Sequence, residues 1–478
     1  MRRLVSLITV LGLGLISSAP AKAQEAGTYP LYLHEVLTSS ARFYPEILES
    51  FAKRRAAAGA VLEADGAFDL VFESDGFDRA TGVWDGRYVN AGVRQNLGLL
   101  GAQLYGGYRV SGGEFPIYEN EYFTNTGGEL KIGVLFSLLR DRAIDQRRFD
   151  AGDARLALEQ ADFEVLLTQV GVQTKAFIAY FRWVWAGARL SVYEDLERIA
   201  RERQRALEEK VRSGARAEIY LTENRLNIAR RERLSTEARR DFLTAANTLS
   251  LYYRDGSGKP LVPSASRVPP IGTLVQRQDL NIVMGGQVSE VLLRRPELQI
   301  LRTRLERARQ RVELSYNDLK PRLDFTSELS GDLGSVGLGG PTFNSTDTIL
   351  GLRFSVPFQQ RTAWGRIDKA EAELDAVDQR RRQTEDQIEI DLRNIILDLN
   401  ASQKLLRITA EELNQSLTME KAEQDRFAGG ASEFFLVILR EEAAAEARIL
   451  YYLAGLQFRI AQANYDGATL NLARLGLR

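Results

Sequence analysis

Apolar and polar residues alternate with a period of two in four separate stretches of the chain. In 350–356 the even positions are Leu350, Leu352, Phe354 and Val356, and the odd positions are Gly351, Arg353 and Ser355. The stretches 68–73, 130–138 and 322–329 alternate in the same way. This pattern predicts β-strands with one apolar and one polar face. It suits the wall of a membrane barrel, and it equally suits half-buried strands of a soluble sandwich.

A second pattern has the period of an α-helix and runs much further. No proline occurs from Asp141 to Arg212, and neither glycine nor proline occurs from Arg366 to Arg426. Apolar residues recur at intervals of seven at Leu156, Phe163, Val170, Phe177 and Val184, and again at Leu392, Leu399, Leu406 and Leu413. Heptads predict coiled-coil seams. About 70 residues at about 1.5 Å each form a rod on the order of 100 Å long, too long for one globular core.

Each predicted rod ends in a glycine turn, and a second helix is expected to run back from it. The turns lie at 210–214 and 426–430, and the returning helices at 217–253 and 433–465. The chain is therefore expected to form two helical hairpins, about 140–253 with its tip near 214 and about 362–466 with its tip near 430.

Two proline sites indicate an internal duplication. Pro45 lies in RFYPEILE and Pro296 in LLRRPELQ, and each is expected to begin a helix. The spacing from Glu35 to Asp69 and from Glu290 to Asp324 is the same, 34 residues. Glu73 and Glu328 also correspond. A repeat of half the chain is therefore present, and Pro296 is expected to serve the fold rather than a binding site.

The N-terminus MRRLVSLITVLGLGLISSAPAKAQ has the features of a secretory signal with an A-x-A cleavage site before Gln24. Its apolar stretch, Leu4 to Ile16, is shorter than the ~20 residues needed to span a bilayer. With the duplication, the predicted organisation is a signal peptide at 1–23, a first repeat at 24–258, a linker at 259–285 and a second repeat at 286–478. Strands are expected at about 66–139 and about 321–358.

The composition removes most catalytic and metal chemistry. The chain of 478 residues has no cysteine and one histidine, so thiolate nucleophiles, disulfides and nearly every zinc or copper site are excluded. A net charge of −1 gives no footprint for nucleic acid. We therefore predict no enzyme, no catalytic residue, no cofactor and no metal.

The order of these features resembles the TolC-type outer-membrane efflux proteins, the outer membrane factors. The resemblance rests on RRPEL at 294–298, P-x-L-D-F at 321–325, SVPF at 355–358 and R-F-x-x-G-x-x-x at 426–433. It covers essentially the whole mature chain. The fold it implies is mainly α with a membrane β-barrel, in which duplicated strand and long-helix-hairpin units from a homotrimer form one barrel and a periplasmic α-helical tunnel.

The number of strands also calls for several chains. Two strands in each half give four per chain, whereas the smallest closed membrane barrels need about eight. Three chains give twelve, the number that the resemblance implies. The first half is longer, however, because 87–98 and 102–110 look like a further hairpin, followed by an aromatic and acidic loop at 114–128. This insertion either adds barrel strands or packs at the mouth or inside the barrel.

The resemblance places the adaptor-docking surface at the hairpin tips, with Arg212, Gly214, Arg426, Gly429 and Gly430. Members of the family often carry aspartates six and nine residues after the tip glycine. Here those positions hold Tyr220 and Glu223 in the first repeat and Leu436 and Leu439 in the second. We hypothesise an entrance closed by a ring that contains Leu436 and Leu439 and excludes water, with Glu218, Glu223 or Glu433 supplying charge. The alternative is that both leucines belong to an ordinary coiled-coil seam.

The polar faces of the strands are expected to line the barrel lumen. The residues concerned are Asp69, Glu73, Lys131, Asp324, Glu328 and Arg353. The resulting prediction is an exit duct in the outer membrane of a Gram-negative bacterium, with a large periplasmic part, serving tripartite efflux or type I secretion. Its partners would be two further copies of itself, a periplasmic adaptor, outer-membrane lipid and, indirectly, an inner-membrane transporter, but no nucleic acid. The alternative is a periplasmic coiled-coil scaffold or adaptor without a channel.

Overall fold

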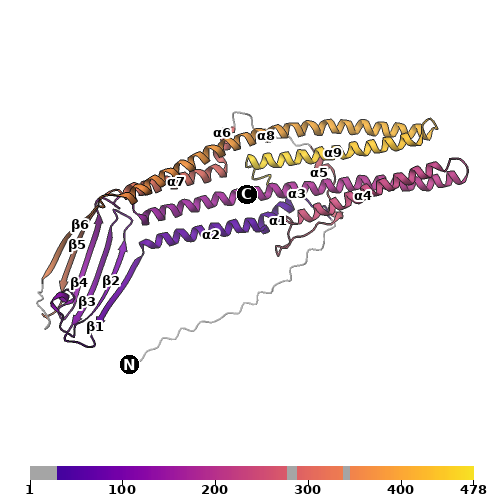
Figure 1. The fold of residues 1–478 in the computed structure, drawn as a ribbon. Helices are drawn as coiled ribbons and strands as arrows, with labels where there is room; N and C mark the ends of the chain where they lie inside the picture. The colour runs from indigo at the N-terminus through magenta and orange to yellow at the C-terminus, as the bar shows by residue number, and fades with distance from the viewer. Residues whose placement is uncertain (1–28, 277–287, 337–344, 478) are drawn as a thin grey trace, which may run out of the picture.

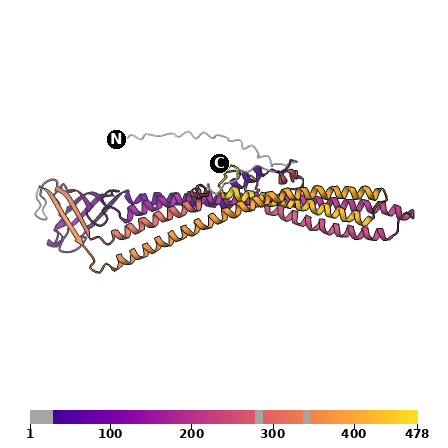
Figure 2. The same cartoon turned by 90° about the horizontal axis from the view of Figure 1, so that it is seen from above.

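A β-sheet lies at one end of a long bundle of helices (Figure 1). The computed structural model describes residues 29–276, 288–336 and 345–477, so the predicted signal peptide lies outside the described residues. The view from above shows the helices running as one rod away from the sheet (Figure 2). Elements of both repeats run the length of this rod.

The first repeat contributes two short and two long helices. They are α1 (Leu33–Phe43), α2 (Pro45–Asp65), α3 (Gln146–Arg212) and α4 (Ile219–Ser250), with a 3₁₀ turn η1 (Gly66–Phe68) after α2. Asp145 caps α3, because its side chain accepts a hydrogen bond from the Arg148 amide. The single helix α3 has 67 residues, so the predicted rod is present.

The second repeat has the same order. Its helices are α6 (Val288–Arg294), α7 (Pro296–Asn317), α8 (Arg361–Ala428) and α9 (Phe434–Ala468). The two halves are joined through η3 (Ala265–Arg267) and α5 (Gly272–Val275). Both diagnostic prolines occupy the first position of a helix, where a missing N–H costs nothing.

The RRPEL stretch does more than begin a helix. The Arg295 guanidinium donates to the carbonyl oxygens of Ala468 at 2.9 Å and Gly467 at 3.4 Å, the last carbonyls of α9. It also pairs with Glu297 at 2.6 Å. A cation at a helix C-terminus satisfies carbonyls that lack intrahelical partners. The start of α7 is thereby fixed to the end of α9.

In the described part of the chain the sheet has six strands, all antiparallel, in the order β1-β2-β3-β4-β5-β6. They are β1 (Leu70–Asp78), β2 (Arg87–Asn96), β3 (Gln103–Gly112), β4 (Glu129–Ser137), β5 (Arg322–Asp332) and β6 (Thr346–Ser355). The expectation of four strands per chain is therefore wrong. The inserted hairpin β2–β3 lies within the sheet, between β1 and β4, and adds two strands to it.

The register gives this sheet one apolar and one polar face across all six strands. The apolar face includes Leu70, Phe72, Val89, Val93, Leu104, Val110, Leu130, Ile132, Val134, Phe136, Phe325, Leu329, Leu350, Leu352 and Phe354. The opposite face carries Glu73, Asp75, Asn90, Arg94, Gln103, Arg109, Glu129, Lys131, Asp324, Glu328 and Arg353. The inserted strands continue both faces, so the hairpin is part of the same two-sided wall.

The largest apolar core lies midway along the rod rather than under the sheet. It packs α1, α3, α4, α5 and α9 around Trp183, Val184 and Leu249, which are fully buried. Leu274 of α5 is also fully buried there, so the connection between the repeats is held in the core. On α8, the predicted seam residues Leu399 and Leu406 pack against α9.

A search of the described helices for a run of 18 residues apolar enough to cross a membrane finds none.

Candidate functional site

The two hairpin tips have the same backbone geometry. Gly214 and Gly430 have φ angles of +72° and +76°, in the left-handed region. The amide after each glycine reaches back to the carbonyl of Lys210 or Arg426, at 2.8 and 2.9 Å respectively. With the glycine amides bonded to Val211 and Phe427, both tips are Schellman motifs. The duplicated fold therefore presents two equivalent turns at its far end.

Replacing either tip glycine by alanine is expected to destabilise its tip by about 1–2 kcal/mol, the cost of a left-handed conformation for a residue with a Cβ. A Cβ at Gly214 or Gly430 would meet no atom within 4 Å, so only the backbone conformation is penalised. Hydrogen exchange at 208–216 and 424–432 measures the effect. Gly171 is the matched control, because it lies inside α3, has no positive φ, and a Cβ there would meet no atom within 4 Å. Gly171→Ala should slow hydrogen exchange around residue 171, because alanine favours the helix more than glycine does.

Aromatic side chains pack the two tips against each other. Phe434, at the start of α9, is 3 % exposed and lies 5.9 Å edge-on from Tyr220 and 6.2 Å from Phe427, between ring centroids. The Arg216 guanidinium lies 5.5 Å from the Tyr220 ring and 5.7 Å from the Phe427 ring. The tips are thus one joined surface, with Arg212, Gly214, Arg426, Gly429 and Gly430 at its exposed edge.

The predicted constriction residues do not share one environment. Glu223, Glu433 and Leu439 are exposed, whereas Tyr220 and Leu436 are half-buried. On α9 the residues that face the other helices are Phe434, Val437, Glu441 and Ala444. Leu439 is 45 % exposed and lies outside this seam, together with Phe435 at 63 %. An ordinary seam position within the protomer therefore does not account for Leu439.

A buried ionic cluster joins the first hairpin to the second near the tips. Glu441 of α9 pairs with Arg231 of α4 at 3.1 Å and with Arg203 of α3, and the side chains of Glu441 and Arg231 are 1 % and 2 % exposed. Arg231 also donates to the Leu196 carbonyl at 2.8 Å. We call Arg203, Arg231 and Glu441 the Glu441 cluster. It is the polar link between α3, α4 and α9 at this level of the rod.

The carboxylate of Glu420, on α8, interacts electrostatically with the Glu441 cluster. Burial and then the nearby Glu441 raise the pKa of Glu420 above its usual value, while Arg448 and Arg231 oppose the shift. The folded state therefore binds a proton more readily than the unfolded chain. The resulting stability is present below about pH 4.5 and is lost as the pH rises through the pKa of the folded state.

Glu420→Gln is therefore expected to raise the melting temperature at pH 7 by about a degree or two and to leave it unchanged at pH 4. The amide keeps the shape and removes the charge that burial disfavours. Thermal unfolding at the two pH values measures this. An equal change at both values would contradict the pKa argument, and Glu446→Gln, on an exposed face of α9, is the control.

Five of the six predicted lumen residues share the polar face of the sheet. Register places Glu73, Lys131, Asp324, Glu328 and Arg353 on that face. Glu73 pairs there with Arg94, and Glu328 accepts a hydrogen bond from Tyr105 at 2.8 Å. Asp69 precedes β1, at the end of η1, so its assignment to a strand is wrong.

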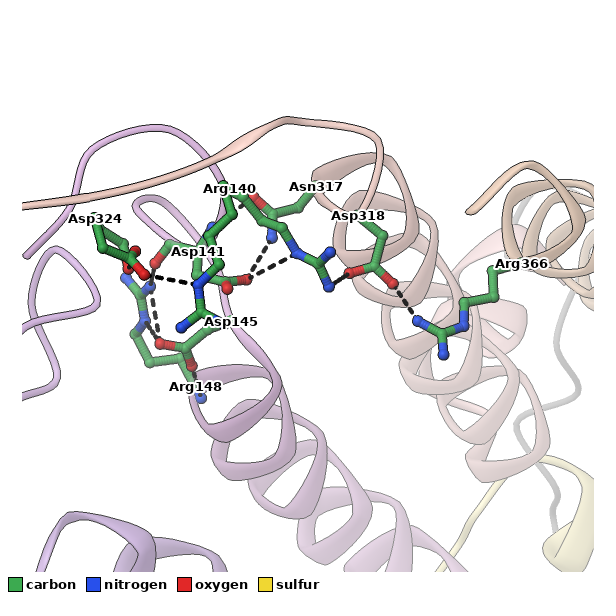
Figure 3. Close-up of polar contacts among 10 residues, drawn as sticks. Arg140, Asp141, Asp145, Arg148, Asn317, Asp318, Asp324 and Arg366 are labelled. Atoms are coloured by element: carbon green, nitrogen blue, oxygen red, sulfur yellow. Dashed lines mark hydrogen bonds and ion pairs between the residues drawn. The ribbon is translucent and has the colours of Figure 1, made fainter. Parts of the chain in front are cut away.

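Asp324 belongs to the junction between sheet and helices rather than to an open surface. Its side chain is 3 % exposed, accepts from Ser137 at 3.2 Å and pairs with Arg322 at 2.7 Å. Figure 3 shows it beside the start of α3, close to Asp145 and Arg148. Its carboxylate therefore fixes the inner end of the wall.

A chain of charges crosses this junction. Asp318, at the end of α7, pairs with Arg140 after β4 and with Arg366 of α8, both at 2.6 Å (Figure 3). Asn317 donates to Asp141 at 2.9 Å and accepts from the Asp141 amide at 3.1 Å. Arg140, Asp141, Asp318 and Arg366 line an open groove of about 340 Å³. The contacts tie the strand ends to helices of both repeats.

Nothing in the described residues has the composition of a metal site, since no group of three or more histidine, aspartate or glutamate side chains is suitably placed. Most of the ion pairs among the described residues join Arg to Asp or Glu, as in the Glu441 cluster and at the junction. They can hold elements together and present charge along a surface.

Sequence reasoning missed the Glu441 cluster, Phe434 and Arg459. A signal existed for Glu441, because it lies at a seam position between Phe434 and Ala445, and charged residues at such positions are buried only when paired. Its partners could not be named, because they lie on other helices whose rotation the sequence does not define.

Comparison with known proteins agrees with this geometry. Residues 287–475 match the family model described as outer membrane efflux protein. A search of curated proteins finds no match.

Solved structures match over both repeats. The outer-membrane channel OprN is 16 % identical with a TM-score of 0.60, covering 91 % of this chain and 89 % of its own. The CmeC outer membrane channel of Campylobacter jejuni is 13 % identical with a TM-score of 0.64, covering 100 % and 98 %. The open state of the MtrE outer membrane channel of Neisseria gonorrhoeae is 16 % identical with a TM-score of 0.64, covering 93 % and 89 %.

The fold defines a protomer of the class in which strands and long helical hairpins build a barrel and a tunnel, and the predicted fold class is confirmed. Within that class, residues 287–475 match the outer membrane efflux protein family by sequence, and both repeats have the fold of the outer-membrane channels named above. The predicted resemblance is thereby confirmed.

Proposed function

We propose that this protein is the outer-membrane exit duct of a tripartite efflux or type I secretion system. The observation that carries the proposal is the six-stranded sheet with one apolar and one polar face, fixed at its inner end to a rod of long helices. A sheet of this kind suits lipid on one side and water on the other. The family match in the second repeat supports the assignment to efflux.

Several copies are needed to complete the barrel. Among the described strands, β1 and β6 form the two edges of the sheet, and each carries exposed apolar residues, among them Phe72 and Leu352. Unpaired edges are not stable in lipid. Because the sheet has an even number of antiparallel strands, β6 of one copy runs opposite to β1 of the next. A homotrimer, the assembly that the family resemblance implies, closes the barrel with three times six strands.

The helical rod would form the periplasmic tunnel, with its tips against an adaptor. Phe435 and Leu439 form an apolar surface on α9 next to the tip, and they stay 63 % and 45 % exposed to solvent among the described residues of the protomer. This placement supports an entrance ring with Leu439, and with Leu436 beside it, that closes by excluding water.

Leu436→Asp with Leu439→Asp is expected to raise the open probability of the channel at least several-fold, because carboxylates hydrate a constriction that apolar side chains keep dry. Single-channel recording in planar bilayers measures it. The pair Leu243→Asp and Leu450→Asp, exposed positions remote from the tips, is the control. An open probability equal to that of the unmodified channel would exclude the leucine ring.

The direct test of the proposed function combines fractionation with conductance. We expect a heat-labile trimer in the outer-membrane fraction that forms ion-conducting pores in bilayers. A soluble periplasmic rod without conductance would instead support the scaffold. That alternative leaves the apolar face of the sheet, with Leu130, Ile132 and Leu350 all more than half exposed, without a covering medium.

A further inference from the structure

The connection between β3 and β4 does not extend outward from the end of the sheet. Residues 113–128 instead fold back over its polar face, with η2 (Ile117–Tyr122) in the middle. Phe115 and Phe123 are 3 % and 9 % exposed, and Thr124 is 2 % exposed. We call residues 113–128 the strap.

The strap is anchored on polar-face positions of four strands. The Tyr122 ring stacks on Tyr88 of β2 at 4.6 Å between centroids, and lies 5.7 Å edge-on from Phe77 of β1. The Thr124 amide donates to Ser111 Oγ of β3 at 2.8 Å, and the Asn125 amide donates to Asp332 of β5 at 3.1 Å.

Two further contacts hold the strap, one within η2 and one just before it. Glu119 forms an ion pair with Arg79, directly after β1. A Cβ at Gly86 would lie 2.7 Å from the Phe115 ring, so only glycine at that position lets the ring pack. The strap is therefore a built element with apolar, ionic and hydrogen-bonded anchors.

The middle of the strap carries the side chains that project away from the wall. Ile117 and Tyr118 are 86 % and 80 % exposed, while Phe115 and Phe123 on either side are buried against the sheet. Because the polar face is the inner face of a membrane barrel, these two residues point toward the pore axis.

The inserted hairpin widens the pore, whereas the strap narrows its outer mouth. With a strand spacing of about 4.8 Å and a tilt of about 40°, twelve strands enclose a radius of about 12 Å and eighteen strands about 18 Å. The strap covers the polar face at the outer end of the strands that the insertion adds. At the outer mouth, the strap therefore occupies part of the pore width that the two added strands provide.

We propose that the strap is a fixed collar at the outer mouth of the barrel that limits the size of the solutes leaving the duct. The proposal rests on the proposed function, since it requires a conducting barrel. Ile117 and Tyr118 are the residues that set the limit, and the buried anchors hold them in place.

Polymer exclusion in planar bilayers tests the collar. Polyethylene glycols of graded mass are added to the outer side only, where those that enter the barrel lower its conductance. We expect Ile117→Ala with Tyr118→Ala to admit glycols about twofold larger in mass than the unmodified channel does. The control is Val83→Ala, 92 % exposed in the β1–β2 turn at the same end of the sheet, which should leave the cut-off unchanged.

A disulfide tests whether the strap is fixed. Ser111 and Thr124 have their hydroxyl oxygens 3.3 Å apart, and the chain has no cysteine of its own. Oxidised Ser111→Cys with Thr124→Cys is expected to keep the cut-off of the unmodified channel. A smaller cut-off after oxidation would mean that the strap normally lies elsewhere and would overturn the proposal.

The proposed duct and the proposed collar are contradicted by different results. A protein that forms no pore contradicts the proposed duct. A pore whose cut-off is the same with and without Ile117 and Tyr118 contradicts the collar alone, provided that both variants are recovered as trimers from the outer membrane.

Discussion

Glu441→Gln is expected to loosen the contact between the two helical hairpins near their tips, at a cost of about 3–5 kcal/mol. The side chain of Glu441 is 1 % exposed and neutralises Arg231, which is 2 % exposed. Glutamine has nearly the same shape, so the change removes the carboxylate that pairs with both Arg203 and Arg231. An uncompensated charge in that position costs more than a cavity of similar size.

The effect should be local and measurable by hydrogen exchange. Amides of α4 around Arg231 and of α9 around Glu441 are expected to exchange roughly a hundred-fold to several thousand-fold faster, as a loss of about 3–5 kcal/mol implies when exchange follows local opening. Single-channel records should also show longer openings, because the hairpins separate more easily. Exchange rates within threefold of those of the unmodified protein would contradict the predicted cost.

A compensating variant separates charge from packing. Replacing the whole Glu441 cluster by apolar residues, with Arg203→Met, Arg231→Met and Glu441→Leu, is expected to restore most of the protection, because buried ion pairs replaced by packed apolar groups are often neutral or stabilising. If the amides of the triple variant exchange as fast as those of Glu441→Gln, hydrogen bonds such as that from Arg231 to the Leu196 carbonyl contribute more to the contact than the charges do.

Arg459→Met is the second change with a large expected effect, about 3–5 kcal/mol. Arg459 of α9 is 3 % exposed and donates to the carbonyl oxygens of Thr273 at 2.7 Å, Gln276 at 3.0 Å and Leu274 at 3.2 Å. These carbonyls lie in or directly after the short helix α5, and methionine would remove the guanidinium that donates to all three. The guanidinium lies 5.1 Å from the Phe181 ring, so cation–π contact is also lost.

Arg459→Met is expected to loosen the connection between the two repeats. Burial lowers the pKa of Arg459 to about 10, yet the group stays charged near neutral pH and holds α5 against α9. We expect Arg459→Met to expose 265–276 to proteases and to lower trimer yield, while Arg459→Lys retains about half of the protection. Arg440→Met, on the same helix nearer the tip, is the control. Resistance to cleavage in Arg459→Met would show that Leu274 alone holds the connection.

The sequence predicted the features that depend on long periodic patterns. The hairpins, both tip glycines and the helix starts at Pro45 and Pro296 follow from heptads, turn residues and the duplication. The seam residues Leu399 and Leu406 are buried as their spacing predicts. These features are local, so the sequence alone determines them.

The number of strands and the course of the strap depend on distant contacts. In β2 and β3, Gly92, Gly106 and Gly107 interrupt the alternation, so the hairpin could be recognised but not placed in the sheet. The direction of the strap depends on packing of Tyr122 against Tyr88 and on the bond from Asn125 to Asp332. Such contacts join segments that are far apart in the sequence, and no periodic pattern in the sequence shows which segments meet.

The antiparallel order of the sheet allows the wall to change without affecting the rod. The hairpin β2–β3 leaves the sheet's outer end and returns to it, so it contributes no helix and leaves α2, α3, α7 and α8 to meet the wall as before. The width of the wall can therefore change by one hairpin per chain while the helices that carry the tips keep their arrangement. For engineering, grafting or removing this hairpin offers a way to change cargo size in a working export system.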